Sequence, residues 1–322
     1  MDWNLGLTFY SINPIIFEPS QLEDPRARKQ IQDEKYHIYV VCKRKKIFFE
    51  SYTLHSNYSV TQLYFLDEKH DKVFLEFRHP KDLIVHSWKD GIYKITFYGR
   101  EGELDDLKFQ ALLRNVDKEF LEGHTNPEFW DLEVVYIGQA FGRTETKTID
   151  YRLSNHEKVQ KIALDIVKSG TIEEVIIIGL KIATNDFGTS FVSLDSNFKR
   201  PTVESLTELV KKAQQRISEG QEVTVYEASL IKYFKPDLNT EYKETFPSKD
   251  FSSYEELMET DFDISTMSID TEPLGVKLYS KAVSEAKFLH HHFYPLKTKS
   301  DKRSLFEFLY DLSNETDESK PL

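Results

Sequence analysis

Four polar side chains, spread along the chain, are of types that can act together on a phosphate group. Tyr136 lies in an apolar run, and Glu227 precedes an apolar stripe with helical spacing. Arg152 and His156 stand four residues apart, so they share one face of a helix. A guanidinium donates charge-assisted hydrogen bonds to phosphoryl oxygens, and one carboxylate can serve as the protein ligand of Mg²⁺. Brought together, side chains of these types can support metal-assisted hydrolysis of a phosphodiester.

Three segments hold these residues in order. Residues 134–139 read VVYIGQ, and residues 152–156 read RLSNH. Residues 227–239 follow the pattern Glu-x-x-Leu-Ile-Lys-x-x-x-Pro-x-x-Asn. Together they resemble the core of the GIY-YIG nucleases, in which a Tyr-Ile-Gly strand end, an arginine-bearing helix and a helix opened by a metal-binding glutamate follow one another. The third segment closely resembles its counterpart in the bacterial nucleotide-excision-repair incision subunit.

The resemblance implies a role for each of these residues. It implies that Glu227 binds one Mg²⁺ or Mn²⁺ ion and that Arg152 stabilises charge on the phosphoryl oxygens. Tyr136 would orient or deprotonate the attacking water, and His156 would assist proton transfer. The implied substrate is nucleic acid, with DNA expected. The residues implied to bind the substrate are Gln139, Arg143, Lys232 and Asn239, of which Asn239 would also tie the end of the glutamate helix to the site.

A second tyrosine, Tyr93, is a further candidate for the catalytic site. Gly91-Ile92-Tyr93 spells the other half of the family's name, and in that family this strand pairs with the Tyr-Ile-Gly strand. We therefore expect residues 91–96 to lie antiparallel beside residues 134–137, with the Tyr93 phenol near Tyr136 and Glu227. About 40 residues intervene, which is allowed because loop-closure entropy grows only logarithmically with length. The alternative is an ordinary edge strand of the N-terminal part, which leaves Tyr136 as the only motif tyrosine.

Each residue also has a purely structural interpretation. Tyr136 can be a half-buried strand tyrosine, Arg152 a solvated helix residue, and Glu227 a first-turn acid near the positive end of a helix dipole. The competing function is a catalytically inactive GIY-YIG-like scaffold that binds a protein or a nucleic acid through its N-terminal β-rich part. A net charge of −12 favours this scaffold, because phosphate-dominated binding needs many basic contacts. The joint presence of the motif residues favours the enzyme.

The elements that must position these residues follow from periodicity and turn signals. Glu227 is expected at the start of a helix that Pro236 ends, and residues 175–182 form a continuous apolar run typical of a central strand. The helix at 203–219 is expected to begin after Thr202 and to stop at Gly220. The remaining expected strands are 36–42, 46–52, 60–66, 73–77, 83–86, 134–137, 263–269 and 276–279, and the remaining helices are 104–121, 150–168 and 304–312.

These elements predict an α+β fold, a small mixed GIY-YIG-like sheet flanked by helices, with an N-terminal β-rich domain and insertions. Residues 1–90 are the expected β-rich domain, without an assigned role. Residues 91–245 are the expected nuclease domain, with insertions at about 100–130 and 183–222. Residues 246–322 are expected to be a C-terminal β extension with an acidic tail.

Composition excludes several other classes. The 322 residues contain one cysteine, Cys42, so no intramolecular disulfide can form, and no apolar run approaches the roughly 20 residues that a membrane helix needs. We expect a cytoplasmic protein without a membrane partner. The chain lacks a glycine-rich phosphate loop, cysteine-based zinc spacing and Gly-x-Ser-x-Gly. Consecutive residues do not share a face of a strand, so residues 290–292, three histidines, are expected at the surface or in cross-strand packing rather than at a metal.

Overall fold

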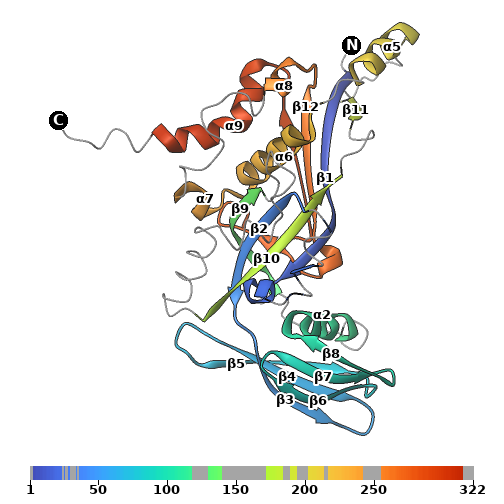
Figure 1. Cartoon of the computed structure of the whole chain (residues 1–322), viewed down its shortest axis with the longest axis vertical. Helices are drawn as coiled ribbons and strands as arrows, with labels where there is room; N and C mark the ends of the chain where they lie inside the picture. Colours follow the sequence, from blue (N-terminus) through green and yellow to red (C-terminus); the bar gives the residue numbers. More distant parts are fainter. Residues whose placement is uncertain are drawn as a thin grey trace, which may run out of the picture.

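A computed structural model of the chain describes residues 3–23, 25, 28–29, 34, 36–117, 130–139, 172–183, 189–193, 202–213, 217–241 and 255–314. The fold is a mixed α and β structure consisting mostly of strands (Figure 1). One large curled mixed sheet forms the upper part, and two small antiparallel sheets form a lobe below it. The coarse prediction of a fold containing a mixed sheet and helices is therefore confirmed.

The large sheet has the order β13-β9-β2-β10-β1-β12-β14, and β11 pairs with β1 outside this path. Three antiparallel strands, β9, β2 and β10, are consecutive neighbours within it. The β1–β12 and β13–β9 pairs are parallel, which makes the sheet mixed. The strands are β1 (Trp3–Phe17), β2 (Ile38–Lys45), β9 (Leu132–Gln139), β10 (Glu173–Ile182), β11 (Thr189–Ser193), β12 (Ile264–Asp270), β13 (Leu278–Tyr279) and β14 (Leu289–Pro295).

Strands β2 and β10 are buried on both faces, as their apolar runs predict. One face of these strands contributes Ile38, Val40 and Ile178 to the main core, and the other contributes Tyr39 and Val41 to a second core. The prediction that residues 175–182 form a central strand is confirmed. Both faces of this part of the sheet therefore hold packed side chains.

Helix α6 (Glu219–Phe234) lies between the sheet and α9 (Lys299–Asn314), as Figure 1 shows. An unbroken stretch of α6, residues 223–231, is buried, because the curled sheet covers one side while Leu305 and Phe306 of α9 join the same core. A bridge between Leu278 and Lys287 brings the two ends of the curl together. Helix α6 is therefore a core helix. The other helical segments are η1 (Pro19–Glu23), α5 (Val203–Ala213), α7 (Asp237–Glu241), α8 (Glu255–Glu259) and η5 (Glu272–Leu274).

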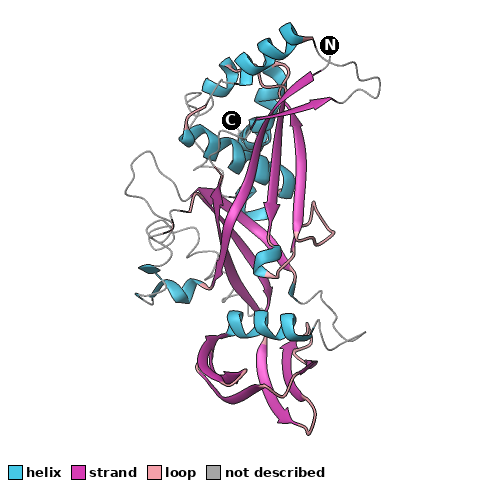
Figure 2. Ribbon diagram, turned by 90° about the vertical axis from the view of Figure 1, so that its right-hand side faces the viewer, coloured by secondary structure: helices cyan, strands magenta, loops and turns pink. Residues whose placement is uncertain are grey.

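The small lobe, residues 48–117, lies between β2 and β9 in the sequence. Helix α2 lies between the lobe's strands and the large sheet in Figure 2. The two small sheets share one core with α2, which includes Leu63, Phe77 and Phe109. The lobe comprises β3 (Phe48–Leu54), β4 (Ser59–Leu66), β5 (Lys72–His79), β6 (Leu83–Lys89), β7 (Ile92–Phe97), β8 (Arg100–Asp105) and α2 (Asp106–Asp117).

The expected boundary at residue 90 is wrong. Strands β1 and β2 belong to the large sheet, whereas β3 to β8 form the lobe, so residues 1–90 are not one unit. The sequence pattern does not predict strand β1, because Asn13-Pro14 resembles a turn. In the structure the strand continues through this pair, with an irregularity between Ile12 and Ile15 in its pairing with β10. In contrast, the expected strands at 263–269 and 276–279 are observed as β12 and β13 and extend the large sheet, and β14, where no strand was expected, is a further strand of it.

The position expected for Glu227 at a helix start is also wrong. Helix α6 begins at Glu219, about two turns earlier, and Gly220 lies in its first turn instead of ending the preceding helix. Val223, Thr224 and Val225 are β-branched residues that weaken a helical pattern, and their burial in the core overrides this weak propensity. None of the helices described is long and apolar enough to cross a membrane.

Candidate functional site

Two tyrosines face each other across neighbouring strands. Strand β2 runs antiparallel to β9, with Tyr39 opposite Gly138 and Val41 opposite Tyr136. The rings of Tyr39 and Tyr136 are stacked, with centroids 6.0 Å apart and an interplanar angle of 30°. Tyr39 is 1% exposed and Tyr136 is 7% exposed. The pairing of β2 with β9 therefore gathers two phenols on one face of the large sheet.

Gly138 makes room for this arrangement. A Cβ atom at this position would lie 2.6 Å from both Cζ and Oη of Tyr39, and 2.9 Å from Cε1 of Tyr136. The Tyr39 phenol thus lies directly across the backbone of the opposing strand. The YIG sequence of β9 therefore joins a tyrosine to the one residue type that admits a second tyrosine beside it.

Tyr39 is absent from the residues that the sequence predicts for the site. The segment His37-Ile38-Tyr39 at the start of β2 places histidine where Gly-Ile-Tyr would have glycine. The missed signal was an Ile-Tyr pair that opens an apolar strand. The long interval between residues 45 and 132 concealed that this strand pairs with β9.

The expected pairing of residues 91–96 with residues 134–137 is wrong. Strand β7 pairs with β6 and β8 in the small lobe, where the Tyr93 ring stacks on Phe109 at a centroid distance of 3.8 Å. Burial raises the pKa of the Tyr93 phenol, and Asp106 raises it further. The physical reason is the turn before it, because Asp90 and Gly91 both have positive φ angles and form the two-residue connection of a β6–β7 hairpin.

Glu227 approaches the end of β9 from α6. Its side chain is buried, and its Oε2 atom accepts a hydrogen bond of 2.8 Å from Nε2 of Gln139. The same Gln139 nitrogen lies 3.2 Å from Oγ1 of Thr224, one turn earlier on the helix. Gln139 was predicted to bind substrate, and the structure brings it to Glu227. Tyr39 and Glu227 therefore approach adjacent residues of β9, Gly138 and Gln139, from opposite faces of the sheet, because Tyr39 belongs to the second core and α6 packs in the main core.

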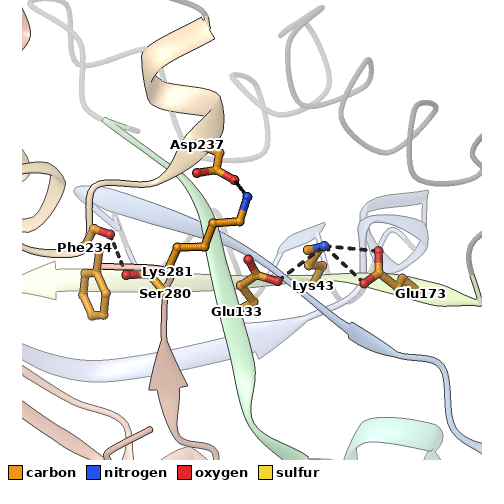
Figure 3. Close-up of polar contacts among 7 residues, drawn as sticks. All are labelled: Lys43, Glu133, Glu173, Phe234, Asp237, Ser280 and Lys281. Atoms are coloured by element: carbon orange, nitrogen blue, oxygen red, sulfur yellow. Dashed lines mark hydrogen bonds and ion pairs between the residues drawn. The ribbon is translucent and has the colours of Figure 1, made fainter. Parts of the chain in front are cut away.

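Asn239 completes the edge of β9. Its Oδ1 accepts from the backbone N–H of Ile137 and its Nδ2 donates to the carbonyl oxygen of the same residue, both at 2.8 Å. The amide thus imitates a neighbouring strand and joins α7 to β9. Figure 3 shows further contacts at this joint, a hydrogen bond of 2.6 Å from Ser280 to the Phe234 carbonyl oxygen and an ion pair of Lys281 with Asp237.

A lysine joins the three antiparallel strands on which the site is built. Lys43 of β2 lies 3.4 Å from Glu133 of β9 and 3.2 Å from Glu173 of β10 (Figure 3). Burial lowers the pKa of Lys43, but the two carboxylates outweigh this effect and the pKa is raised. The ammonium therefore stays charged between two acids, which fixes β9 and β10 to the strand between them.

His37 occupies the first position of the His-Ile-Tyr segment. Its Nδ1 accepts a hydrogen bond of 3.0 Å from the backbone N–H of Ile182, and its Nε2 lies 3.4 Å from Glu219 at the start of α6. Burial lowers the pKa of His37, although Glu219 acts in the opposite direction. A neutral ring with its proton on Nε2 satisfies both contacts. His37 thus connects β2, β10 and the start of α6.

Of the remaining residues that the sequence predicts for the site, Lys232 contacts other elements and three lie outside the described part of the chain. The Lys232 ammonium donates to the backbone carbonyl oxygen of Ser304 in α9 and lies 5.7 Å from the centroid of the Tyr294 ring. Its contacts thus lie with α9 and β14, whereas Glu227 contacts β9. Arg143, Arg152 and His156, together with the helix expected at 150–168, lie outside the residues that the structure describes.

The donor set at the end of β9 fits one hard divalent cation. Glu227 supplies a carboxylate, and the amide of Gln139 holds one of its oxygens without neutralising the charge. Across the described ranges, no group of three His, Cys, Asp or Glu side chains could hold a metal, so a multi-ligand zinc site has no support there. Mg²⁺ commonly binds one or two carboxylates and retains several waters, which matches a single glutamate.

The histidines of residues 290–292 lie in β14, opposite β12, so the prediction of cross-strand packing is confirmed. His290 is buried and its Nδ1 lies 3.1 Å from the Tyr233 hydroxyl. His291 and His292 are exposed.

No protein-family model, no curated protein and no solved structure matches this chain. The residues around the end of β9 therefore carry the functional argument.

Proposed function

We propose that the chain is a metal-dependent endonuclease of the GIY-YIG type, which hydrolyses phosphodiester bonds of nucleic acid, with DNA as the expected substrate. The observation that carries this proposal is the antiparallel pairing of β2 with β9, which places Tyr39 against Tyr136 and Gly138. In the resemblance, a Gly-Ile-Tyr strand pairs with a Tyr-Ile-Gly strand. Here His37-Ile38-Tyr39 takes the first role and residues 136–138 take the second.

The order of elements supports the same proposal. Strands β2 and β9 are followed by the segment that holds Arg152, then by β10, then by α6 with Glu227. The three strands β9, β2 and β10 form an antiparallel core with β2 at its centre, to which the rest of the large sheet is added. The small lobe is then an insertion between the two motif strands. Insertions of this length are tolerated because the strand ends stay anchored by their pairing.

The proposed mechanism divides the work among a few side chains. Glu227 would hold one Mg²⁺ or Mn²⁺ ion, which supplies Lewis-acid stabilisation of the phosphate oxygens and the leaving group. Arg152 would donate hydrogen bonds to the nonbridging oxygens as negative charge develops. The resemblance gives Tyr136 the task of orienting the attacking water, which we extend to Tyr39, and gives His156 that of assisting transfer of its proton. Both tyrosines lie on the sheet face opposite α6, so they would act across the end of β9 from Glu227.

Two residues act through these side chains as positioning residues. Gln139 donates its amide to Glu227, so it fixes the orientation of the carboxylate while leaving its charge intact. Asn239 holds the backbone of Ile137, the residue between Tyr136 and Gly138. A shift of the β9 end would therefore move the tyrosine, the glycine and Gln139 together.

A second candidate function, the binding scaffold, is favoured by one face of the small lobe. Phe48, Tyr64 and Phe74 lie opposite one another across β3, β4 and β5, and the Lys72 ammonium lies 4.2 Å from the centroid of the Tyr64 ring. Phe74 is 49% exposed. Aromatic rows beside basic side chains bind single-stranded nucleic acid by stacking, so the lobe would capture substrate in either function.

A nicking assay with supercoiled plasmid and either Mg²⁺ or Mn²⁺ tests the proposal. We expect the wild type to nick, and Glu227→Gln to lose cleavage by about 10²-fold or more while retaining its fold and its DNA binding. Glu208→Gln on the exposed part of α5 is the matched control and should cleave like the wild type. DNA binding without cleavage of DNA or RNA by the wild type would establish the scaffold instead. Wild-type cleavage by Glu227→Gln at saturating Mg²⁺ would remove Glu227 from the metal site.

A further inference from the structure

Strand β5 forms one edge of the small sheet β3-β4-β5. Among the described residues it pairs along its whole length with β4, and no strand pairs with its other side. Its first three residues, 72–74, are all exposed, and the Phe74 side chain is 49% exposed. An edge strand offers a row of backbone N–H and C=O groups to a further strand. Strand β5 is therefore an open edge with a large apolar side chain beside it.

Two hairpin hydrogen bonds determine which backbone groups of β5 lie at this edge. The N–H of Asp67 donates to the carbonyl oxygen of Asp71 at 3.0 Å, so these residues form a hydrogen-bonded pair of the β4–β5 hairpin. The bond of 2.9 Å from the N–H of His55 to the carbonyl oxygen of Tyr58 gives the same alternation from the β3–β4 hairpin. Because hydrogen-bonded and non-hydrogen-bonded pairs alternate, the odd-numbered residues of β5 bond to β4. The N–H and C=O groups of its even-numbered residues therefore point away from the sheet.

The same even-numbered residues carry their side chains on one face of the sheet. They are Lys72, Phe74, Glu76 and Arg78, and all are exposed. Lys72 and Glu76 carry opposite charges and lie two residues to either side of Phe74. Within one copy, Lys72 pairs with Glu50 at 2.7 Å and Glu76 lies 3.7 Å from Arg78. All four side chains stay partly exposed, so Lys72 and Glu76 can each take a further partner.

We propose that a second copy of this chain pairs with this edge, with β5 antiparallel to β5 of the partner subunit about a twofold axis at Phe74. In this register Phe74 lies opposite the partner subunit's Phe74, and Lys72 lies opposite the partner subunit's Glu76 in both directions. On the other face Val73, which is 36% exposed, meets the partner subunit's Leu75. Opposite charges directly across a strand pair are favourable, and the axis repeats each contact, as an interface between identical copies requires. The outward backbone groups of Lys72, Phe74 and Glu76 are then all bonded.

Neighbouring registers fit less well, mainly because of charge. A shift of the axis by one residue toward the end of β5 sets Lys72 against the partner subunit's Arg78, and a shift by two residues sets the two Glu76 carboxylates against each other. Like charges directly opposite are destabilising. A shift toward the start of β5 sets Glu76 against the partner subunit's His70, which lies in the hairpin turn with a φ angle of 67°. Only the register centred on Phe74 joins Lys72 to Glu76 at both ends.

The same pairing extends the aromatic row of the small lobe. Phe48, Tyr64 and Phe74 lie opposite one another across β3, β4 and β5, and the ring centroids of Phe48 and Tyr64 are 5.1 Å apart. Because Phe74 meets the partner subunit's Phe74, the rows of the two copies become one continuous row on one face of the joined sheet. The dimer rests on the edge of β5 alone, so it is independent of whether the chain cleaves nucleic acid.

Charge reversal, followed by sedimentation velocity across a range of protein concentrations, tests the dimer and its register. The wild type should show a reversible monomer–dimer equilibrium. Lys72→Glu and Glu76→Lys each set like charges opposite one another at both ends, so each should weaken this equilibrium by about 10-fold or more. An equimolar mixture of the two variants should form a mixed dimer with about the wild-type affinity, because both of its charge pairs are again opposite. Lys94→Glu, on an exposed strand residue that lies 3.5 Å from Glu103 in the other small sheet, is the matched control and should dimerise like the wild type.

A cysteine cross-link locates the axis. Cα atoms of a hydrogen-bonded antiparallel pair lie about 5.5 Å apart, within the range that a disulfide spans. Phe74→Cys should therefore form a covalent dimer under mild oxidation, whereas Arg78→Cys should not, because its two copies lie at opposite ends of the paired strands. The native Cys42 is fully buried and does not interfere. A wild type that stays monomeric, a mixture that associates no better than the single charge variants, or cross-linking by Arg78→Cys but not Phe74→Cys would overturn the proposal.

Discussion

Two strands of this molecule carry an isoleucine followed by a tyrosine, and they have different surroundings. In β2, Tyr39 lies across Gly138 and beside Tyr136, at the end of the strand from which Gln139 reaches Glu227. In β7, Tyr93 is enclosed by Phe109 in the core of the small lobe and hydrogen-bonds to Asp106. Strand β7, which carries the Gly-Ile-Tyr sequence, therefore has a structural role in the lobe. Strand β2, which carries His-Ile-Tyr, is the one that pairs with the Tyr-Ile-Gly strand β9.

The two tyrosines also differ in the role of the glycine that lies near each of them, Gly91 for Tyr93 and Gly138 for Tyr39. Gly91 has a φ angle of 77° and belongs to the turn before β7, so it serves the hairpin. Gly138 lies on the strand opposite Tyr39 and serves the close approach of the phenol. Strand pairing, rather than the tripeptide itself, therefore decides which tyrosine can join a site with Tyr136.

The largest expected effect comes from filling the space over Gly138. Gly138→Ala would place its Cβ 2.6 Å from the Tyr39 ring, so both phenols must move. We expect about 1–3 kcal/mol of destabilisation, measured by urea unfolding, and about 10²-fold slower plasmid nicking. Gly102→Ala in β8 is the matched control, since no atom lies within 4 Å of its Cβ position. A fully active Gly138→Ala would show that the ring contact is dispensable.

A smaller effect is expected at Asn239. Asn239→Ala removes both hydrogen bonds to Ile137 and should cost about 1–3 kcal/mol of stability, with a loss of nicking of about 10-fold. Asn239→Asp keeps an acceptor for the Ile137 N–H but cannot donate to its carbonyl oxygen, so it should not restore the wild-type rate. Unchanged cleavage by both variants would place Asn239 outside the positioning of β9.

Much of the local structure was predictable from the sequence. Strands with β-branched and aromatic runs, such as β10 and β4, were expected near their observed bounds, and so was helix α2. Strand β1 was missed because Gly6 and Asn13-Pro14 interrupt its pattern, although pairing on both sides holds it in the sheet. The start of α6 was misplaced because burial, rather than propensity, makes residues 223–225 helical.

The site was predictable only in part. Tyr136, Glu227, Gln139 and Asn239 were expected, and each lies on β9 or bonds to it, but Tyr136 and Glu227 are on opposite faces of the sheet. Tyr39 was missed because pairing between strands separated by an inserted lobe depends on tertiary contacts that no local pattern records. The turn that excludes Tyr93 was visible in principle, because Asp90-Gly91 between two strand patterns is a strong hairpin signal.

The smallest expected effect is a change of stability with pH at Asp106, the carboxyl group that is hydrogen-bonded to Tyr93. Burial raises the pKa of Asp106, and hydrogen bonds from Trp88 and Tyr93 only partly oppose this rise in pKa. The folded state therefore binds the proton more tightly than the unfolded state, so this contribution to stability is present below the ordinary aspartate pKa and is lost as pH rises through the raised pKa.

Asp106→Asn removes this titration while keeping an acceptor for Trp88. Its free energy of unfolding should therefore improve relative to the wild type as pH rises from about 3 to 7. Urea unfolding at several pH values measures this difference, with Glu18→Gln introduced into both proteins, because burial and the charges of Glu174 and Asp106 raise the pKa of Glu18. A difference that does not change with pH would show that Asp106 keeps its ordinary pKa in the folded protein.

The most direct test of the account compares the two tyrosines by removing one hydroxyl from each. Tyr39→Phe should fold like the wild type and lower the nicking turnover by about 10²-fold or more, as expected for a group that handles the attacking water. Tyr93→Phe should lose about 1 kcal/mol of stability with its bond to Asp106, and should cleave within about threefold of the wild-type rate. A Tyr39→Phe variant with wild-type turnover, or a Tyr93→Phe variant that is folded but inactive, would contradict the assignment of β2 as the partner of β9 in the site.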